Sequence, residues 1–328
     1  MLKNRIGLGT FPLANVFAPV DKNKAKDIVK TFLDNGGYFL DCAPMYGFGE
    51  VEVLLGEVFK EYSREKFYIA TKCGYIDVEG KTFQTIQKSG KYDGVIRECE
   101  RSLKRLQVDY IDLYFMHSPD PKVPIEETLR GLEKLQTAGK IKNIGVSNVN
   151  LKELKEYNKT GKIKFIQNRF SLINQSIDSE IQKYLMENNI KLVPYQVIDR
   201  GQLSNRSVTG LELGDKDLRK GRSDWLEGQT SLITFWVKEN LLPLAKEFNI
   251  SIEQLSMSWV LEQEFMGFII VGATNPDQVK SNLHANEIKL TLDQLSQMDN
   301  AYIKLEKEIK DKYGKTIREF RGLNEKYY

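Results

Sequence analysis

The stretch KAKDIVKTFLDNGGYFLD, residues 24–41, contains the local pattern that decides the fold. Over residues 24–35 the apolar positions have the i, i+3, i+4, i+7, i+8 spacing of an amphipathic helix: Ala25, Ile28, Val29, Phe32 and Leu33. Gly36 and Gly37 end this helix, because glycine commonly follows a last helical turn. The run 38–41 then predicts a buried strand. One helix, one tight turn and one strand therefore follow each other directly.

The same unit repeats along the chain. Strands are expected at 5–9, 38–41, 67–71, 110–116, 141–146, 164–167, 191–194 and 268–271. Helices are expected after them at 24–35, 50–60, 93–106, 125–138, 151–157, 177–188, 231–248 and 276–284. This alternation is typical of α/β proteins with a parallel sheet, and eight units close into a (β/α)8 TIM barrel. A doubly wound open sheet is the alternative, but residues 7–10 (GLGT) lack the third glycine of its usual phosphate-binding motif.

Two segments do not fit the repeat. Residues 200–230 form a long polar loop after the seventh strand, and loops of this length in compact domains are usually functional. Residues 288–328 predict an extra C-terminal helix, to residue 312, and a charged, aromatic tail. No linker-like stretch interrupts the chain. We therefore interpret residues 1–328 as a single barrel domain with these two additions.

The composition excludes several classes of protein. Lys and Arg total 48 and Asp and Glu total 45, so the net charge is only +3, which argues against a nucleic-acid partner. No apolar run approaches the roughly 20 residues of a membrane span, and the first residues lack the apolar stretch of a secretory signal. Cys42, Cys73 and Cys99 form no C-x-x-C pair, which is typical of the reducing cytoplasm. With only two histidines, no metal site is expected. These features predict a cytoplasmic protein with a small-molecule partner.

Polar residues gather where the predicted strands end, which is where TIM barrels carry their chemistry. Asp41 ends the second strand, Lys72 follows the third, His117 follows the fourth, and Tyr46 lies in the second loop. A phenol with a pKa of about 10 is a poor acid at neutral pH, but a nearby ammonium favours the phenolate and lowers that pKa. Asp41 would orient Lys72, and His117 would hold a carbonyl oxygen. Any one of these residues alone would have a structural explanation; together they suit proton delivery to a carbonyl.

Seven short motifs occur in order along the chain: residues 8–10 (LGT), 40–47 (LDCAPMYG), 69–72 (IATK), 112–117 (DLYFMH), 145–148 (GVSN), 167–168 (QN) and 269–276 (IIVGATNP). With these motifs the chain resembles the aldo-keto reductases, NAD(P)H-dependent (β/α)8 barrels, from residue 5 to about residue 290. The resemblance implies reduction of an aldehyde or ketone to an alcohol by hydride transfer. It also implies that Asp41, Tyr46, Lys72 and His117 are a catalytic tetrad with Tyr46 as the general acid.

The resemblance further implies a cofactor site along the same rim. Residues expected in it are Gly9, Thr10, Ser147, Asn148, Gln167, Tyr195, Gln196, Ile198, Arg200, Gly272, Thr274, Gln278 and Asn282. Ser147, Asn148 and Gln167 match the residues that bind the nicotinamide carboxamide, and Tyr195 matches the aromatic that stacks on its ring. The stretch 196–200 would run beside the pyrophosphate, and 272–282 would hold the adenosine end. NADP(H) is expected before NAD(H), although Lys280 is the only basic residue in 272–282.

Two other functions stay open. The chain also resembles the potassium-channel β subunits, which share this fold and bind NADPH while acting through a partner, although no partner-binding extension is visible. A (β/α)8 aldolase that uses Lys72 as a Schiff base is the second alternative. The substrate of a reductase would be a sugar-like or small aliphatic carbonyl compound. Its expected apolar wall comprises Phe11, Met45, Phe48, Tyr75 and Tyr313.

Overall fold

A computed structural model describes residues 4–76, 80, 82, 85–215, 217–220, 222, 225 and 227–322. Its main sheet has eight strands: β1 (Ile6–Gly9), β2 (Phe39–Asp41), β3 (Tyr68–Cys73), β6 (Ile111–Met116), β7 (Ile141–Ser147), β8 (Ile163–Gln167), β9 (Lys191–Leu192) and β10 (Ile269–Gly272). Their order is β10-β1-β2-β3-β6-β7-β8-β9, and neighbouring strands are parallel. A short antiparallel pair, β4 (Tyr75–Ile76) and β5 (Gln87–Lys88), follows β3.

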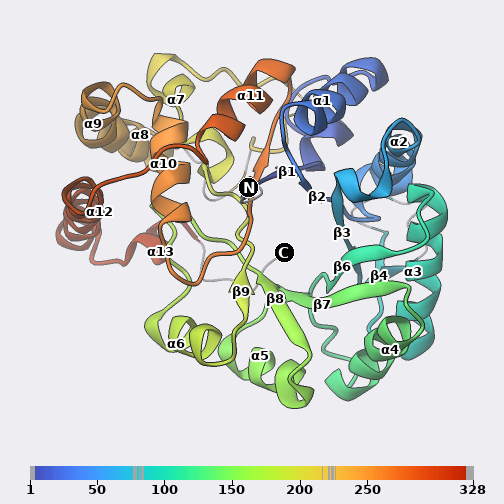
Figure 1. Cartoon of the computed structure of the whole chain (residues 1–328). Helices are drawn as coiled ribbons and strands as arrows, with labels where there is room; N and C mark the ends of the chain where they lie inside the picture. The colour runs from blue at the N-terminus through green and yellow to red at the C-terminus, as the bar shows by residue number, and fades with distance from the viewer. Residues whose placement is uncertain are drawn as a thin grey trace.

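Backbone hydrogen bonds between the two end strands close this sheet into a ring. The amide of Gly267 donates to the carbonyl of Leu192 at 2.7 Å, and the amide of Ile270 donates to the carbonyl of Pro194 at 2.9 Å. Figure 1 shows the strands around a common centre with helices outside them. The prediction of a (β/α)8 TIM barrel is therefore confirmed.

Eight helices accompany the strands of the barrel: α1 (Lys22–Asp34), α2 (Glu50–Phe59), α3 (Tyr92–Leu106), α4 (Ile125–Thr137), α5 (Leu151–Tyr157), α6 (Ser179–Glu187), α10 (Ile252–Leu261) and α11 (Pro276–His284). Helix α1 shows why the sequence folds this way. The Asp21 side chain accepts hydrogen bonds from the first free amides, and the predicted apolar stripe is the face that is buried. The helix follows the periodicity of residues 24–35 to within a few residues.

The seventh barrel helix differs from the prediction. Residues 231–248 are largely helical, as α8 (Glu227–Trp236), a π-helical turn (Val237–Leu241) and α9 (Leu242–Glu247). It is α10, however, that contacts β10 and lies between α6 and α11, whereas α8 and α9 lie further out (Figure 1). The assignment of 231–248 to the barrel is therefore wrong. Helix α10 is buried on nearly all sides and so has no amphipathic pattern to reveal it.

The two added segments contain more structure than predicted. The expected loop 200–230 includes the short helix α7 (Asn205–Thr209) and the first turn of α8. The expected C-terminal helix is α12 (Leu292–Tyr313), and the expected tail contains a further short helix, α13 (Ile317–Phe320), while residues 323–328 lie outside the described residues. Capping side chains explain α12 and α13, because Thr291 and Thr316 each begin a capping box. Among the described residues, no helix combines the length and apolar character needed to cross a bilayer.

The core has two layers. One lies between the strands and the helices, and the other fills the inside of the ring with Phe39, Ala70, Leu113, Phe115, Val193 and Ile270. Two glycines make room for the interior rings. A Cβ on Gly7 would lie 2.4 Å from the Phe39 ring, and one on Gly145 would lie 2.4 Å from the Phe115 ring. The inside of the ring is thus filled by apolar side chains below its upper rim.

Candidate active site

The two-residue period of a strand brings the predicted polar residues to one rim. Side chains two positions apart in a strand point to the same face. Three residues follow an interior residue at this offset, at or just beyond the end of their strands: Asp41 after Phe39, Lys72 after Ala70 and His117 after Phe115. The same offset holds for Ser147 after Gly145, Gln167 after Phe165, Tyr195 after Val193 and Gly272 after Ile270. One layer of the barrel therefore carries most of the candidate site.

The centre of the site is the ammonium group of Lys72, which is fully buried. Its Nζ donates to both carboxylate oxygens of Asp41 at 2.8 and 2.9 Å, and to the carbonyl of Cys42 at 2.7 Å. It also lies 3.3 Å from the phenolic oxygen of Tyr46. A buried ion pair thus holds a positive charge against one hydroxyl group, which is the arrangement expected from the sequence.

His117 completes this group. Its ring meets that of Tyr46 edge-on at 6.4 Å between centroids and that of Tyr75 edge-on at 5.3 Å. Burial, together with the charges of Lys72 and Lys88, holds the pKa of His117 well below its usual range. The imidazole is therefore neutral at pH 7, with one nitrogen available as a hydrogen-bond donor.

An amide and a hydroxyl group stand beside the ion pair. The Gln167 side-chain amide donates to Asp41 Oδ1 at 2.8 Å, and the Ser147 hydroxyl donates to the backbone carbonyl of Gln167 at 2.6 Å. Gln167 and Asp41 are both almost fully buried. Asp41 thus accepts hydrogen bonds from both Lys72 and Gln167, so the orientation of the carboxylate is set from two sides.

A second chain of hydrogen bonds runs through Asn148. Its amide donates to the backbone carbonyl of His117 at 2.8 Å, and its side-chain oxygen accepts a hydrogen bond from the Tyr195 hydroxyl at 2.8 Å. Asn148 has a positive φ of 58°, a conformation that asparagine tolerates better than most residues. The Tyr195 ring is therefore tethered beside Asn148, on the same rim as the tetrad.

Gly9 and Thr10 lie at the end of β1. The Thr10 hydroxyl donates to the backbone carbonyl of Asp41 at 2.8 Å, and the Thr10 amide donates to the same carbonyl at 3.0 Å. Gly9 pairs with Gly272 of β10, and a Cβ at Gly9 would lie 2.6 Å from the Ile270 side chain. Both residues position strand ends, and their expected contact with a cofactor stays a prediction.

Residues 195–202, here named the β9 loop, have an unusual backbone. Four of them have positive φ: Gln196 (58°), Asp199 (48°), Arg200 (55°) and Gly201 (97°). The side chain of Ile198 packs against the core. Arg219, whose side chain also binds Asp217, donates to the Arg200 carbonyl at 3.0 Å. The β9 loop is therefore held from the core side and from the following segment.

The candidate adenosine site is at the start of α11. Gln278 Oε1 accepts hydrogen bonds from the amide of Thr274 at 2.8 Å and from its hydroxyl at 3.2 Å. The Asn275 side chain caps the helix by accepting from the Gln278 amide, and the Asn282 amide lies 3.5 Å from the Gly272 carbonyl. The four predicted residues Gly272, Thr274, Gln278 and Asn282 therefore do lie together.

Sequence reasoning missed two buried charges near the β9 loop. Asp199 is 1% exposed and Arg321 is fully buried, and the two form an ion pair. The nearest sequence signal is a charged residue directly after the apolar Ile198, which is too weak to find Asp199. Nothing in the sequence around Arg321 indicates a partner 122 residues away.

The cysteine thiols have no role in this chemistry. Cys42, Cys73 and Cys99 are buried and free, and burial raises the pKa of each thiol, that of Cys73 to about 12. Each is therefore protonated at neutral pH, as a packing residue is and a nucleophile is not. Within the described ranges, no cluster of three or more His, Cys, Asp or Glu side chains could hold a metal ion.

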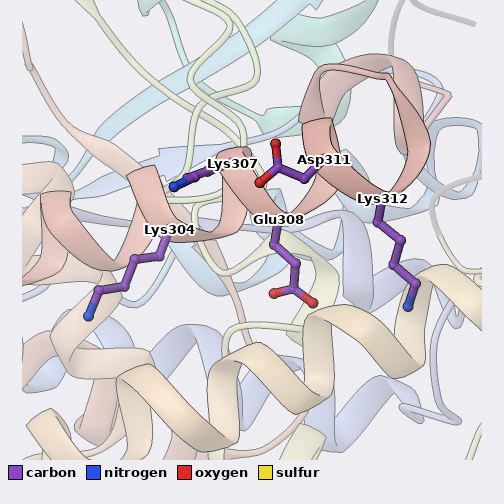
Figure 2. A pocket seen from close by; sticks show the side chains of 5 residues that line it. All are labelled: Lys304, Lys307, Glu308, Asp311 and Lys312. Carbon is purple, nitrogen blue, oxygen red and sulfur yellow. The ribbon is translucent and has the colours of Figure 1, made fainter.

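A hollow of about 500 Å³ lies elsewhere, along α12. Charged side chains from that one helix line it: Lys304, Lys307, Glu308, Asp311 and Lys312 (Figure 2). All five are exposed, and they project from the helix surface in different directions. Such mixed charges are typical of a solvated helix face, so the strand ends remain the candidate site.

Comparison with known proteins identifies the family. A model of the Aldo/keto reductase family matches residues 5–303. Aldo-keto reductase YhdN of Bacillus subtilis is 32% identical over 281 residues, covering 85% of this chain and 83% of that protein. The NADH-specific methylglyoxal reductase of Escherichia coli is 29% identical, covering 88% and 91%.

Solved structures agree as well. The glycerol dehydrogenase AKR11B4 from Gluconobacter oxydans superposes with a TM-score of 0.82 at 26% identity, covering 92% of this chain and 91% of that one. The family predicted from the seven motifs is confirmed. The chain belongs to the aldo/keto reductase family and is an oxidoreductase.

Proposed function

We propose that this protein reduces an aldehyde or ketone to an alcohol with a nicotinamide dinucleotide, and that Tyr46 is the general acid. The observation that carries the proposal is the position of the buried Lys72 ammonium between the Asp41 carboxylate and the Tyr46 hydroxyl, at 3.3 Å from the latter. A fixed positive charge at this distance stabilises the phenolate that is left when Tyr46 gives up its proton.

Each of the four tetrad residues has a separate role in the proposed reduction. His117, neutral and aimed at the same rim, donates a hydrogen bond to the carbonyl oxygen and orients it. Tyr46 donates its proton to that oxygen as negative charge develops there, and Lys72 stabilises the phenolate formed. Asp41 keeps Lys72 in place by accepting hydrogen bonds from its Nζ at both carboxylate oxygens. A reduced nicotinamide, when bound, would supply the hydride that the carbonyl carbon accepts.

The residues around the tetrad fit such a cofactor. Asn148, Gln167 and Ser147 offer amide and hydroxyl groups for a carboxamide, and Tyr195 is tethered beside them for stacking. Gln196 Oε1 and the Ser118 hydroxyl are buried without a hydrogen-bond partner among the described residues. Buried polar groups are normally paired, so these two atoms suit a bound polar ligand.

For the cofactor we propose NADP(H) first and NAD(H) second. The positive end of α11 suits a phosphate group, and Lys280 within that helix is the only basic residue in 272–282. The relatives differ by name: aldo-keto reductase yakc of Schizosaccharomyces pombe, 28% identical, is named for NADP(+), whereas the E. coli relative is named NADH-specific. Titrating the protein with NADPH and NADH and following tyrosine and tryptophan fluorescence measures the preference directly.

The substrate proposed is a small aliphatic or sugar-like carbonyl compound. Phe11 packs on Tyr46 with 5.0 Å between ring centroids, and Tyr75 packs on His117 at 5.3 Å, so two of the expected wall residues contact the tetrad. Tyr313 instead packs on Phe320 at the end of α12. The names of two relatives, a methylglyoxal reductase and a glycerol dehydrogenase, also point to three-carbon compounds.

The test is an assay of the purified protein with NADPH or NADH and a panel of carbonyl compounds, followed by loss of reduced-cofactor absorbance. Methylglyoxal, glyceraldehyde and short ketones should be reduced, and a bulky aromatic ketone should be reduced more slowly. Oxidation of neither cofactor with any member of the panel would disprove the proposal.

The alternative aldolase role of Lys72 is disfavoured by its surroundings. A Schiff base needs a free, unprotonated amine, whereas the Lys72 Nζ is inaccessible and bound to Asp41 and to the Cys42 carbonyl. Borohydride added with a carbonyl substrate should therefore leave Lys72 unlabelled, as mass spectrometry of the digested protein would detect.

A further inference from the structure

The C-terminal arm reaches the β9 loop through one arginine. Helix α13 is anchored by Ile317 and Phe320, which pack into the core, and by Gln229 of α8, whose amide donates to the Phe320 carbonyl at 2.6 Å. Arg321 follows directly after this helix. Its side chain is fully buried and belongs to a segment that lies outside the eight barrel units.

Arg321 binds two residues at the end of the β9 loop. Its Nη2 donates to Asp199 Oδ2 and, at 3.2 Å, to Gln202 Oε1. Asp199 and Gln202 are each 1% exposed, so this cluster is shielded from bulk solvent. Removing one member of such a pair leaves an uncompensated buried charge, which is strongly unfavourable. The Arg321 side chain therefore holds Asp199 in one position.

The backbone conformation of the β9 loop is unfavourable by itself and has to be fixed by contacts with other residues. Gln196, Asp199 and Arg200 adopt left-handed conformations without being glycine. Each such residue raises the free energy of the folded chain, and it persists only where the surroundings impose it. Asp199 is the one of these three whose side chain is fully buried in an ion pair. The ion pair of Asp199 therefore offsets the conformational cost of these left-handed residues.

We propose that Arg321 is a positioning residue for cofactor binding: through Asp199 it holds the β9 loop in the conformation that accepts the dinucleotide. This inference rests on the proposed function, because it takes the β9 loop to contact the cofactor. Arg321 itself touches neither substrate nor tetrad. Its loss should therefore weaken cofactor affinity and shorten cofactor residence, because a preorganised loop binds with a smaller ordering cost.

The experiment compares Arg321→Met with Arg64→Met in the full-length protein. Arg64 also forms a largely buried ion pair, with Asp112 at 2.6 Å, but it precedes β3 at the opposite end of the barrel. Both variants lose an arginine from a largely buried ion pair. Arg64→Met therefore controls for the general destabilisation that such a loss causes. Fluorescence titration gives Kd for NADPH and NADH, stopped-flow gives the release rate, and hydrogen exchange without cofactor reports on residues 196–202.

We expect Arg321→Met to raise Kd and the release rate about tenfold, and to speed hydrogen exchange in the β9 loop. Arg321→Lys, which keeps a cation, should lie between Arg321→Met and the wild type, and it remains measurable if Arg321→Met does not fold. Arg64→Met should leave cofactor Kd and β9-loop exchange unchanged. In an Asp199→Asn background, Arg321→Met should change Kd much less.

Three outcomes would contradict the proposal in different ways. Unchanged Kd and unchanged β9-loop exchange in Arg321→Met and Arg321→Lys would leave Arg321 a purely structural residue. Equal loss of affinity in Arg64→Met and Arg321→Met would assign the effect to general destabilisation. A wild-type protein that binds neither NADPH nor NADH would overturn the proposed function, and this inference with it.

Discussion

The barrel carries an ion pair at each end of its strands, and the two pairs differ in what else they touch. At the lower end Arg64 binds Asp112 and donates to the carbonyls of Phe67 and Tyr110, at 3.0 Å each. At the upper end Lys72 binds Asp41 and also lies against the hydroxyl of Tyr46.

The first pair contacts only groups that hold the fold together, whereas the second also contacts a group that can take part in the reaction. The guanidinium of Arg64 donates to the Asp112 carboxylate and to two backbone carbonyls, and it stacks on the Tyr110 ring at 3.9 Å. It therefore holds the starts of β3 and β6 together. The ammonium of Lys72 is aimed partly at a group that can release a proton. The more exposed pair thus braces the fold at one end, and under the proposed function the more deeply buried pair prepares an acid at the other.

The largest expected effect is that of Tyr46→Phe at the upper end. Loss of a general acid lowers turnover by about 10²–10⁴-fold, while cofactor titration by fluorescence should be unchanged. The matched control is Tyr68→Phe, because the Tyr68 hydroxyl accepts a hydrogen bond from Asn143 at 3.0 Å at the lower end. Equal turnover losses in the two variants would remove the distinction between the ends.

Lys72→Met should affect both chemistry and stability. Without the ammonium the Tyr46 phenolate is not stabilised, so turnover should fall about 10²–10³-fold. Asp41 is also left buried without its ion-pair partner, which should lower the free energy of unfolding by about 3–5 kcal/mol. Steady-state kinetics and urea denaturation measure the two effects. Normal turnover of Lys72→Met would show that the Lys72–Asp41 pair only stabilises the fold.

Arg64→Met should affect stability alone. Its pair with Asp112 is slightly exposed, so the expected loss is smaller, about 1–3 kcal/mol in the free energy of unfolding. Turnover at 25 °C should equal that of the wild type once folding is verified by circular dichroism. A substantial fall in turnover for a folded Arg64→Met would mean that the lower end also takes part in the chemistry.

The smallest expected effect is a pH dependence caused by His117. Its pKa is below the usual value in the folded chain, so between that lowered pKa and about 6.5 the unfolded chain binds an extra proton. Stability should therefore fall as pH drops below about 6.5, by up to about 1.4 kcal/mol per pH unit from this residue. Urea denaturation of wild type and His117→Asn should show a steeper slope in the wild type; parallel slopes would refute this.

Much of the barrel could be predicted because its signals are local. Residues 24–41 show this, since one amphipathic stripe and one glycine pair determine α1 and the start of β2. The upper rim could also be predicted, because parallel strands bring their carboxyl ends together. Asp41, Lys72 and His117 needed no long-range information beyond the order of the strands.

The remainder depends on contacts that leave no local trace. Helix α10 is buried on almost every side, so it has no stripe, and the more amphipathic stretch before it was predicted in its place. The left-handed residues Gln196, Asp199 and Arg200 carry no glycine signal. The partner of Asp199 lies near the other end of the chain, and only the folded structure brings Arg321 to it.

The three buried cysteines have a practical consequence. A thiol reacts with oxidants and alkylating agents as the thiolate, and burial raises the pKa of Cys42, Cys73 and Cys99 in the folded chain. Cys42 directly follows Asp41 and Cys73 directly follows Lys72, so the two thiols next to these residues in sequence resist oxidation in the folded chain. Iodoacetamide would accordingly alkylate these cysteines only in molecules whose barrel has transiently opened. The rate of alkylation would therefore measure how often the barrel opens.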